Sequence, residues 1–250
     1  MIPIKNTEQL KKMRDACRIT GEALLVAEEL IRPGISTKAL DEAIRAYIER
    51  CGARATFLGY GGFPGAACIS INSEVIHGIP SPDRILKEGD IVKVDVGATY
   101  RGFTGDAART FPVGTVSAEA LALIKETKAC FDLGAAAALS GTRIGDIGSA
   151  VEGHALLCGY SVVRKFVGHG VGAELHEEPE VPNFGTAGRG VRLFPGMTLA
   201  IEPMINAGSA EVRVLPDRWT VVTVDGSLSA HYENTVAVTE HGPEIMTDIK

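Results

Sequence analysis

The sequence predicts an α/β protein in which helices cover one central antiparallel sheet and the chain forms two related halves. Segments with the helical period of about 3.6 residues alternate with segments that follow the two-residue period of strands. The chain also resembles itself when Cys51 is placed on Cys158, a shift of 107 positions. Of the 250 residues, 45% are hydrophobic and 22% charged, so we expect one domain with a large core over residues 1–250.

Two helices are expected in the first half. Asn6 and Gln9 have the spacing of a capping box, and apolar residues then recur at helical spacing until Pro33-Gly34. A second helix begins near Ser36 and ends at Cys51-Gly52, where glycine is a typical C-terminal stop.

The second half repeats this order of helices. Ser117 and Glu119 open a third helix that runs through the alanine-rich residues 134–138. Asp146 opens a fourth helix, which closes at Cys158-Gly159. The two halves are therefore expected at about residues 6–112 and 113–245.

The shift also aligns acids of the two halves. It superposes Gly34 on Gly141, Ala43 on Ala150, Cys51-Gly52 on Cys158-Gly159, Gly61 on Gly168, Gly89 on Gly196 and Asp95 on Glu202. About twenty extra residues then follow in the second half, because the acid that corresponds to Asp106 is Glu233. A chance alignment is the alternative, since helix stops and glycine turns recur in many α/β proteins. If the repeat is real, both halves contribute strands to one sheet, and the acids meet near its pseudo-twofold axis.

A strand hairpin is expected over residues 91–111. Its alternating valines predict strands, and Arg101-Gly102 provides the turn. In that register Asp95 lies opposite Ala108, and Asp106 is one diagonal step away on the same face. Two buried carboxylates repel each other unless a proton or a cation compensates, so a divalent metal is the natural candidate. The alternative is that one aspartate is a turn residue or lies at a solvated edge.

Three histidines add imidazole nitrogens to the candidate metal ligands. His169 and His176 lie in one glycine-containing segment, and His77 follows a strand-like run. Carboxylates with imidazole suit Mn, Fe, Co or Zn better than Ca or Mg. Zincin chemistry is excluded because Glu180 stands where a second histidine would be needed, and a dinucleotide loop at residues 168–172 is not expected. Taken singly, each histidine is more often a structural residue.

Composition limits the partners and the compartment. The formal net charge is −6, so no global basic field recruits nucleic acid or an acidic membrane. No apolar run is long enough to span a bilayer. The five cysteines are widely spaced without a C-x-x-C pair, which favours reduced thiols and a cytoplasmic location.

Five segments together resemble the bacterial type I methionine aminopeptidases, and this resemblance runs over nearly the whole chain. The segments are NSEVIHGIP, KVDVGATYRGFTGDAARTF, VGHGVGAELHEEPEV, AIEPM and SAHYENTV. The resemblance implies a pita-bread fold with a site for two divalent ions, which are Co, Mn, Fe, Zn or Ni. It implies the metal ligands Asp95, Asp106, His169, Glu202 and Glu233, of which Asp106 and Glu233 bridge both ions. His77 and His176 are implied as catalytic residues that bind substrate without binding metal, and Glu202 is implied as a proton relay.

The implied activity is removal of the initiator methionine from nascent proteins whose second residue is small. The implied methionine pocket consists of Tyr60, Phe63, Cys68, Leu175 and Trp219, whereas core packing is favoured for Phe57. Leu175 stands where the family usually has Phe, and His231 and Asn234 stand where Gln and His are usual. The expected partners are peptides with N-terminal methionine, together with a transient contact to the ribosome, and the expected state is a monomer.

Two other functions remain open from the sequence. The first is a prolidase or Xaa-Pro aminopeptidase of the same fold, although those usually carry an extra N-terminal domain. The second is a catalytically inactive binding module, although such relatives typically lose metal ligands.

Overall fold

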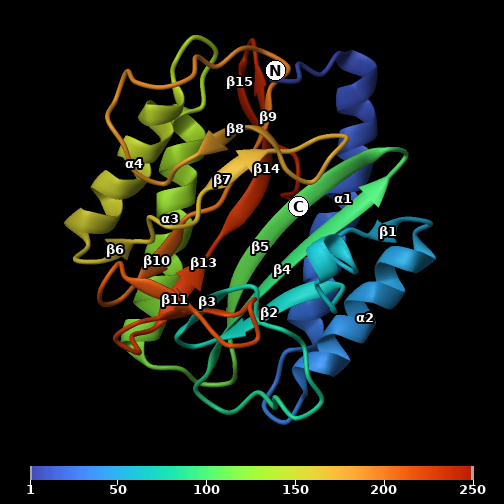
Figure 1. Ribbon diagram of the computed structural model, residues 1–250, viewed down its shortest axis with the longest axis vertical. Coiled ribbons are helices and arrows are strands. Elements are labelled where there is room, and N and C mark those ends of the chain that lie inside the picture. The colour runs from blue at the N-terminus through green and yellow to red at the C-terminus, as the bar shows by residue number, and fades with distance from the viewer. Residues whose placement is uncertain (1, 249–250) are drawn as a thin grey trace.

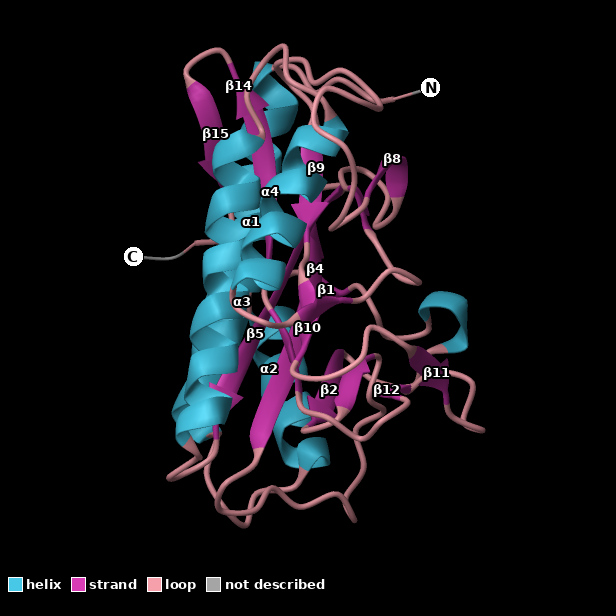
Figure 2. Cartoon of the chain, turned by 90° about the vertical axis from the view of Figure 1, so that its left-hand side faces the viewer, coloured by secondary structure: helices cyan, strands magenta, loops and turns pink. Residues whose placement is uncertain are grey.

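The computed structural model describes residues 2–248, with four long helices on one side of a central sheet (Figures 1 and 2). The helices are α1 (Thr7–Leu30), α2 (Thr37–Arg50), α3 (Ala118–Ala137) and α4 (Ile144–Leu157). Short strands and loops lie on the opposite side of the sheet (Figure 2). Among residues 2–248 no helix is both long and apolar enough to cross a membrane.

The central sheet contains strands from both halves of the chain. Its order is β1 (Arg54–Ala55), β4 (Ile91–Tyr100), β5 (Phe103–Pro112), β14 (Glu233–Thr239), β9 (Thr198–Ile201), β7 (Gly168–Gly170) and β8 (Glu177–Val181). Two further strands extend it, β2 (Ala67–Ile71) beside β4 and β15 (Gly242–Ile245) beside β14. All its strand pairs are antiparallel, as predicted.

Two small sheets and one short helix complete the described structure. One sheet has the order β13 (Ser229–His231), β10 (Met204–Asn206) and β6 (Ser161–Val162). The other has the order β11 (Val212–Val214), β12 (Val221–Thr223) and β3 (Glu74–Ile76), and a 3₁₀ turn, η1, covers Tyr60–Gly62.

The hairpin of β4 and β5 forms in the predicted register. Asp95 pairs with Ala108, and Asp106 pairs with Gly97, one step away along the same face. Arg101 and Gly102 both have positive φ, at 51° and 80°, as a two-residue turn between twisted strands requires. Both aspartates therefore point to the side of the sheet that the helices leave uncovered.

The pseudo-twofold repeat is visible in the strand order. β5 and β14 pair at the centre, and β4 and β9 flank them on opposite sides. α2 and α4 begin and end at positions 107 residues apart, as the shift predicts. The superposition of Gly61 on Gly168 is wrong, because Gly61 lies in η1 whereas Gly168 begins β7 in the central sheet.

Helix starts follow their capping residues with one exception. The Asn6–Gln9 capping box is formed, and Ser36 and Ser117 cap α2 and α3. The predicted start of the fourth helix at Asp146 is wrong, because α4 begins at Ile144. Asp146 lies in the first turn, and its carboxylate accepts the backbone N–H of Arg143 at 2.7 Å.

Candidate functional site

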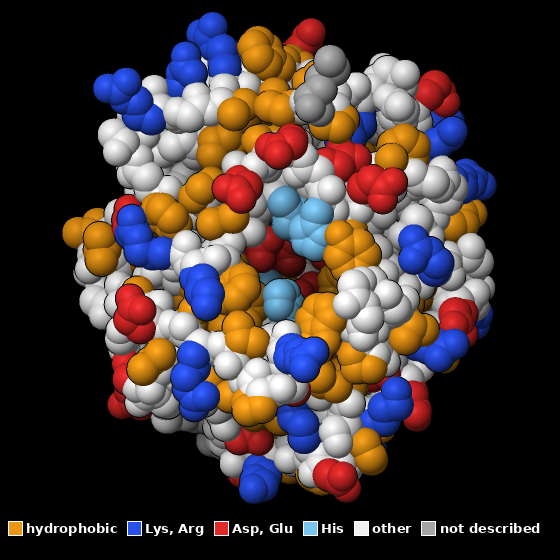
Figure 3. All heavy atoms as spheres, in the orientation of Figure 1, with side chains coloured by type: hydrophobic (Ala, Val, Ile, Leu, Met, Phe, Trp, Pro, Cys, Tyr) orange, Lys and Arg blue, Asp and Glu red, His pale blue; other side chains and the backbone are white. Residues whose placement is uncertain are grey.

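A cavity of about 150 Å³ opens on the sheet face opposite the helices. Figure 3 shows this hollow near the centre of the face, with acidic side chains at its floor and histidines beside them. It is lined by Phe57, Tyr60, Phe63, Cys68, His77, Asp95, Asp106, His169, Leu175, His176, Glu202, Trp219 and Glu233. Every site residue expected from the sequence is therefore brought to one place.

Four carboxylates from the central strands converge at the floor of the cavity. Asp95 comes from β4, Asp106 from β5, Glu202 directly follows β9, and Glu233 begins β14. Burial raises the pKa of Asp106 to about 7. Burial, and then the neighbouring acids, raise the pKa of the other three well above their ordinary values.

Two carboxylate oxygens at this floor are left without a protein partner. Asp95 Oδ1 and Asp106 Oδ1 are buried, and neither has a hydrogen-bond partner among residues 2–248. Buried anions of this kind are normally paired or bound to metal. The donor set therefore fits divalent cations.

His169 presents a lone pair to these acids. Its Nδ1 lies 2.8 Å from the carbonyl oxygen of Gly170, which can only accept, so Nδ1 carries the proton of the neutral ring. Its Nε2 lies 3.6 Å from both Asp106 Oδ2 and Glu202 Oε1. Burial, with a smaller contribution from His176, lowers the pKa of His169 to about 4, which keeps the ring neutral. This is the tautomer and charge state of a metal ligand.

His231 is a second imidazole at the carboxylates, and the sequence reasoning missed it as a site residue. Its side chain is 1% exposed, and its Nε2 lies 3.7 Å from Glu202 Oε2 and 3.9 Å from Glu233 Oε2. Neither ring nitrogen has a hydrogen-bond partner within the described part of the chain. The available signal was the spacing of two between His231 and Glu233, which places both side chains on one face of an extended segment.

His176 and His77 stand at the cavity apart from the carboxylate cluster. The Tyr60 hydroxyl lies 2.7 Å from His176 Nδ1, and the ring centroids of His176 and His169 are 4.2 Å apart. His77 has φ of 59°, a backbone conformation that residues other than glycine seldom adopt and that concentrates at functional sites. Burial lowers the pKa of His77 to about 4 and also lowers that of His176.

Aromatic and apolar side chains form the remaining wall. Phe63 and Trp219 meet edge to face at 5.1 Å, within a buried cluster that includes Cys68 and Leu175. Burial, and then Asp95, raise the pKa of Cys68, so its thiol is an uncharged part of this wall.

Phe57 belongs to the same wall, and the core packing expected for it is confirmed. Its ring is packed in the apolar cluster but also lines the cavity. A Cβ on Gly97 would lie 2.7 Å from Phe57 Cε1, so the glycine in β4 makes room for the ring.

Comparison with known proteins identifies relatives over the whole chain. The model of metallopeptidase family M24 matches residues 11–240. A methionine aminopeptidase of Clostridium acetobutylicum is 52% identical over 247 residues, which cover 99% of both chains. The structure of methionine aminopeptidase from Thermotoga maritima superposes with a TM-score of 0.98 at 42% identity over 100% of both chains. A prolidase structure from Pyrococcus horikoshii, with a TM-score of 0.80 and 23% identity, covers 99% of this chain and 64% of the prolidase and shares the fold alone.

Proposed function

Because the chain belongs to metallopeptidase family M24 and to its methionine aminopeptidases, we propose that the cavity holds two divalent ions and removes an N-terminal methionine there. The proposed ligands are Asp95, Asp106, His169, Glu202 and Glu233, and the proposed ions are drawn from Co, Mn, Fe, Zn and Ni. The observation that carries this proposal is the pair of buried, unpartnered oxygens on Asp95 and Asp106. When bound, such ions supply Lewis acidity toward a carbonyl and a lowered pKa for water.

His176 is the proposed donor to the oxygen of the scissile amide. When the Tyr60 hydroxyl donates to Nδ1, the neutral ring carries its proton on Nε2, which is then free to donate to substrate. A hydrogen bond to a developing oxyanion is worth about 3 to 4 kcal/mol in the transition state. His77, which lines the same cavity as a neutral ring, is the proposed partner of the amide nitrogen.

Glu202 is the proposed proton carrier. Its carboxylate lies beside His169 and His231, and burial and the neighbouring acids raise its pKa. A carboxylate whose pKa is raised toward neutrality can take up a proton and release it again within one reaction cycle.

The apolar wall sets the proposed preference for the first residue. Phe57, Phe63, Cys68, Leu175 and Trp219 surround a space that suits one unbranched thioether side chain. The second residue of the substrate then lies outside this pocket, and we propose that it must be small. We further propose that the enzyme acts as a monomer in the cytoplasm on chains that emerge from the ribosome.

The test compares substrates and metals on the purified full chain. Metal is first removed from the protein with a chelator. The protein is then reloaded with Mn²⁺ or Co²⁺ and assayed on Met-Ala-Ser and on X-Pro peptides. Turnover of Met-Ala-Ser that disappears on chelation and returns with metal supports the proposal. Preferential turnover of X-Pro peptides would favour a prolidase, and turnover of neither would favour an inactive binding module.

A further inference from the structure

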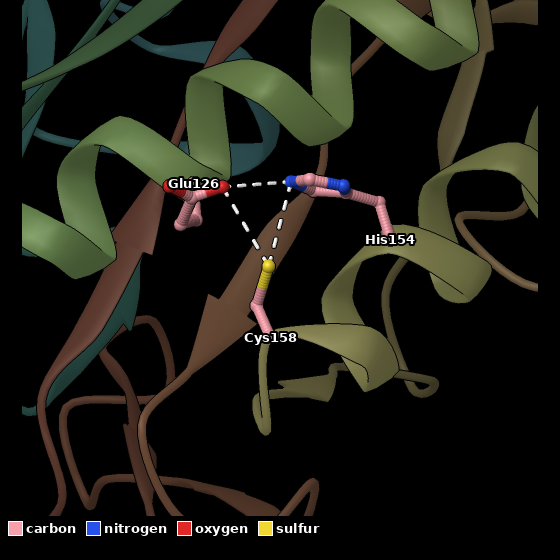
Figure 4. Close-up of side chains that lie close together, drawn as sticks. All are labelled: Glu126, His154 and Cys158. Carbon is pink, nitrogen blue, oxygen red and sulfur yellow. Dashed lines mark hydrogen bonds and ion pairs between the residues drawn. The ribbon is translucent and has the colours of Figure 1, made fainter.

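A second group of metal-binding residue types lies on the helical layer, outside the cavity. Glu126 belongs to α3, whereas His154 and Cys158 are one turn apart at the C-terminal end of α4 (Figure 4). His154 Nε2 lies 2.8 Å from Glu126 Oε2, and Cys158 Sγ lies 3.6 Å from each of these two atoms. The mechanism proposed above uses none of these residues.

The arrangement differs from that of a Cys-His-Glu catalytic triad. In a triad, one ring nitrogen of the histidine faces the nucleophile and the other faces the acid. Here the same nitrogen, Nε2, faces both the thiol and the carboxylate, as the triangle of dashed lines in Figure 4 shows. One donor atom from each of three side chains therefore points at a common centre, which is how a metal is bound.

The separations between the donor atoms match a tetrahedral ion. Bond lengths of about 2.3 Å from zinc to sulfur and about 2.1 Å from zinc to nitrogen or oxygen place sulfur about 3.6 Å from each of the other donors. Both observed sulfur separations are 3.6 Å. The hydrogen-bonded nitrogen and oxygen, 2.8 Å apart, would move apart by about 0.6 Å to bind the same ion.

The pseudo-twofold repeat supplies an internal comparison. Cys51 follows α2 as Cys158 follows α4, and Tyr47 occupies the position that corresponds to His154. The Tyr47 hydroxyl donates to Glu22 Oε2 at 2.5 Å, so a carboxylate, a hydrogen-bonding ring and a cysteine recur in the first half. Glu22 is also bound by Arg18, whose guanidinium contacts both of its oxygens, and no imidazole is present there. Of the two groups, only the one in the second half combines a thiol, an imidazole and a carboxylate that no arginine binds.

We propose that Glu126, His154 and Cys158 bind one Zn²⁺ ion in an additional site, with a fourth position open to water. Burial and the Glu126 carboxylate raise the pKa of the Cys158 thiol, so binding forms the zinc–sulfur bond and releases the thiol proton to solvent. The bound ion would join α3 to α4 within the helical layer. Because Cys158 is exposed, the ion can enter directly from solvent.

The test follows the reactivity of individual cysteines in the full chain under reducing conditions. The chelated protein is alkylated with and without added Zn²⁺, and modification is read for each cysteine by peptide mass spectrometry. Zinc binding is expected to slow alkylation of Cys158 by about tenfold or more, since the thiolate is the reactive form and would be held by the metal. Cys51, partly exposed at the equivalent place, is the matched control and should be unaffected.

Variants separate the additional site from the metals of the cavity. His154→Ala and Glu126→Gln should each raise the zinc concentration needed for protection by about 10- to 100-fold or more, because loss of a partner outside the ligand set already costs that much. Tyr47→Phe should leave it unchanged, and all three variants should retain peptidase activity. Unchanged alkylation of Cys158 in the presence of Zn²⁺, or protection that survives His154→Ala, would overturn the proposal. The three residues would then serve only to link α3 and α4 by hydrogen bonds.

Discussion

At the scale of single residues, the hydrogen bond between the Tyr60 hydroxyl and His176 Nδ1 couples the tautomer of the His176 ring to Tyr60. Tyr60 is 44% exposed, so its ring contributes little to the core, and its hydroxyl makes a hydrogen bond of 2.7 Å with His176 Nδ1. The tautomer of a neutral histidine follows from the partner of its other nitrogen. Tyr60 is thus a positioning residue in the proposed mechanism.

We expect His176→Ala to lower kcat by about 100-fold, the usual cost of removing one donor to an oxyanion. Tyr60→Phe should lower kcat by a smaller factor and change KM little, because the imidazole stays but its tautomer is no longer fixed. Steady-state kinetics on Met-Ala-Ser measures both effects. Bound metal should be unchanged in both variants, and loss of metal from His176→Ala would instead identify His176 as a ligand.

His231 provides the second residue-scale prediction. Its unpartnered ring lies beside Glu202 and Glu233, so His231→Ala should weaken metal binding by about 10- to 100-fold. Calorimetric titration of the chelated protein with Mn²⁺ measures this change. His241→Ala removes an exposed histidine and should have no effect. Equal affinity in both variants would show that His231 is a structural residue.

His231 and Phe57 show the limit of sequence reasoning at this scale. A histidine in a strand has the same sequence signature whether it faces an acid or the core, and a buried phenylalanine has the same signature whether or not it also lines a cavity. The difference lies in tertiary distances, such as the 3.7 Å from His231 to Glu202. The five proposed ligands were found because their motifs occur together, in order, along the chain.

At the scale of elements, the hairpin could be predicted because its side-chain alternation and its turn specify the same register. A shift of β4 by one residue relative to β5 would place Asp95 and Asp106 on opposite faces of the sheet. The start of α4 could not be predicted as well, because its capping carboxylate, Asp146, lies inside the first turn. Acids are common both at N-caps and in first turns, so local sequence leaves the start uncertain by a few residues.

The contact between α1 and β5 gives a prediction for this scale. A Cβ on Gly105 would lie 2.7 Å from Cys17 Cα, which belongs to the backbone of α1 and cannot rotate away. Gly105→Ala should therefore lower the free energy of unfolding by about 1 to 3 kcal/mol, the usual cost of overpacking. Urea unfolding measures the change.

Gly153→Ala is the matched control for that measurement. Gly153 lies in α4, and a Cβ there would have no described atom within 4 Å. The substitution should be neutral or should stabilise by up to about 1 kcal/mol, the difference in helix propensity. Similar destabilisation by both substitutions would contradict the argument from close packing.

At the scale of the whole molecule, burial of four acids at the centre makes stability depend on metal and on pH. Burial raises the pKa of Asp106 to about 7, whereas an unfolded aspartate titrates near about 3.9. Between these values the folded state binds more protons than the unfolded chain, so stability falls as pH rises. Asp95, Glu202 and Glu233, whose pKa values are also raised, act in the same direction. His77, His169 and His231, whose pKa values burial lowers, act in the opposite direction below the pKa of an unfolded histidine, about 6.5, so the acids control the trend above that pH.

Metal-free protein should therefore have a larger free energy of unfolding at about pH 6.5 than at about pH 8, the range in which the acids titrate and the histidines are neutral in most molecules of both states. Added Mn²⁺ should reduce this difference, because a bound cation replaces the missing protons and adds about 2.7 kcal/mol at a concentration 100 times its Kd. Urea unfolding at both pH values, with and without metal, measures these quantities. Asp106→Asn should flatten the pH dependence of the chelated protein, and a chelated protein that is more stable at the higher pH would contradict the prediction.

The overall architecture was predictable because the halves repeat, and the departures occur where the repeat has diverged. The constant shift holds for α2 and α4 and for Asp95 and Glu202, but it fails at Gly61 and Gly168. Between those helices and the acids, one half has a 3₁₀ turn where the other has a central strand. A single shift cannot describe two loops that have changed independently.

Because β5 pairs with β14, the proposed metal site lies where the two related halves of the chain meet. Asp106 belongs to one half and Glu233 to the other, so a half-length chain with this fold would carry an incomplete ligand set and would have to dimerise to complete it. The two halves contribute differently to this centre, because His169 and His231 of the second half lie beside the acids whereas the first half contributes Asp95 and Asp106 there.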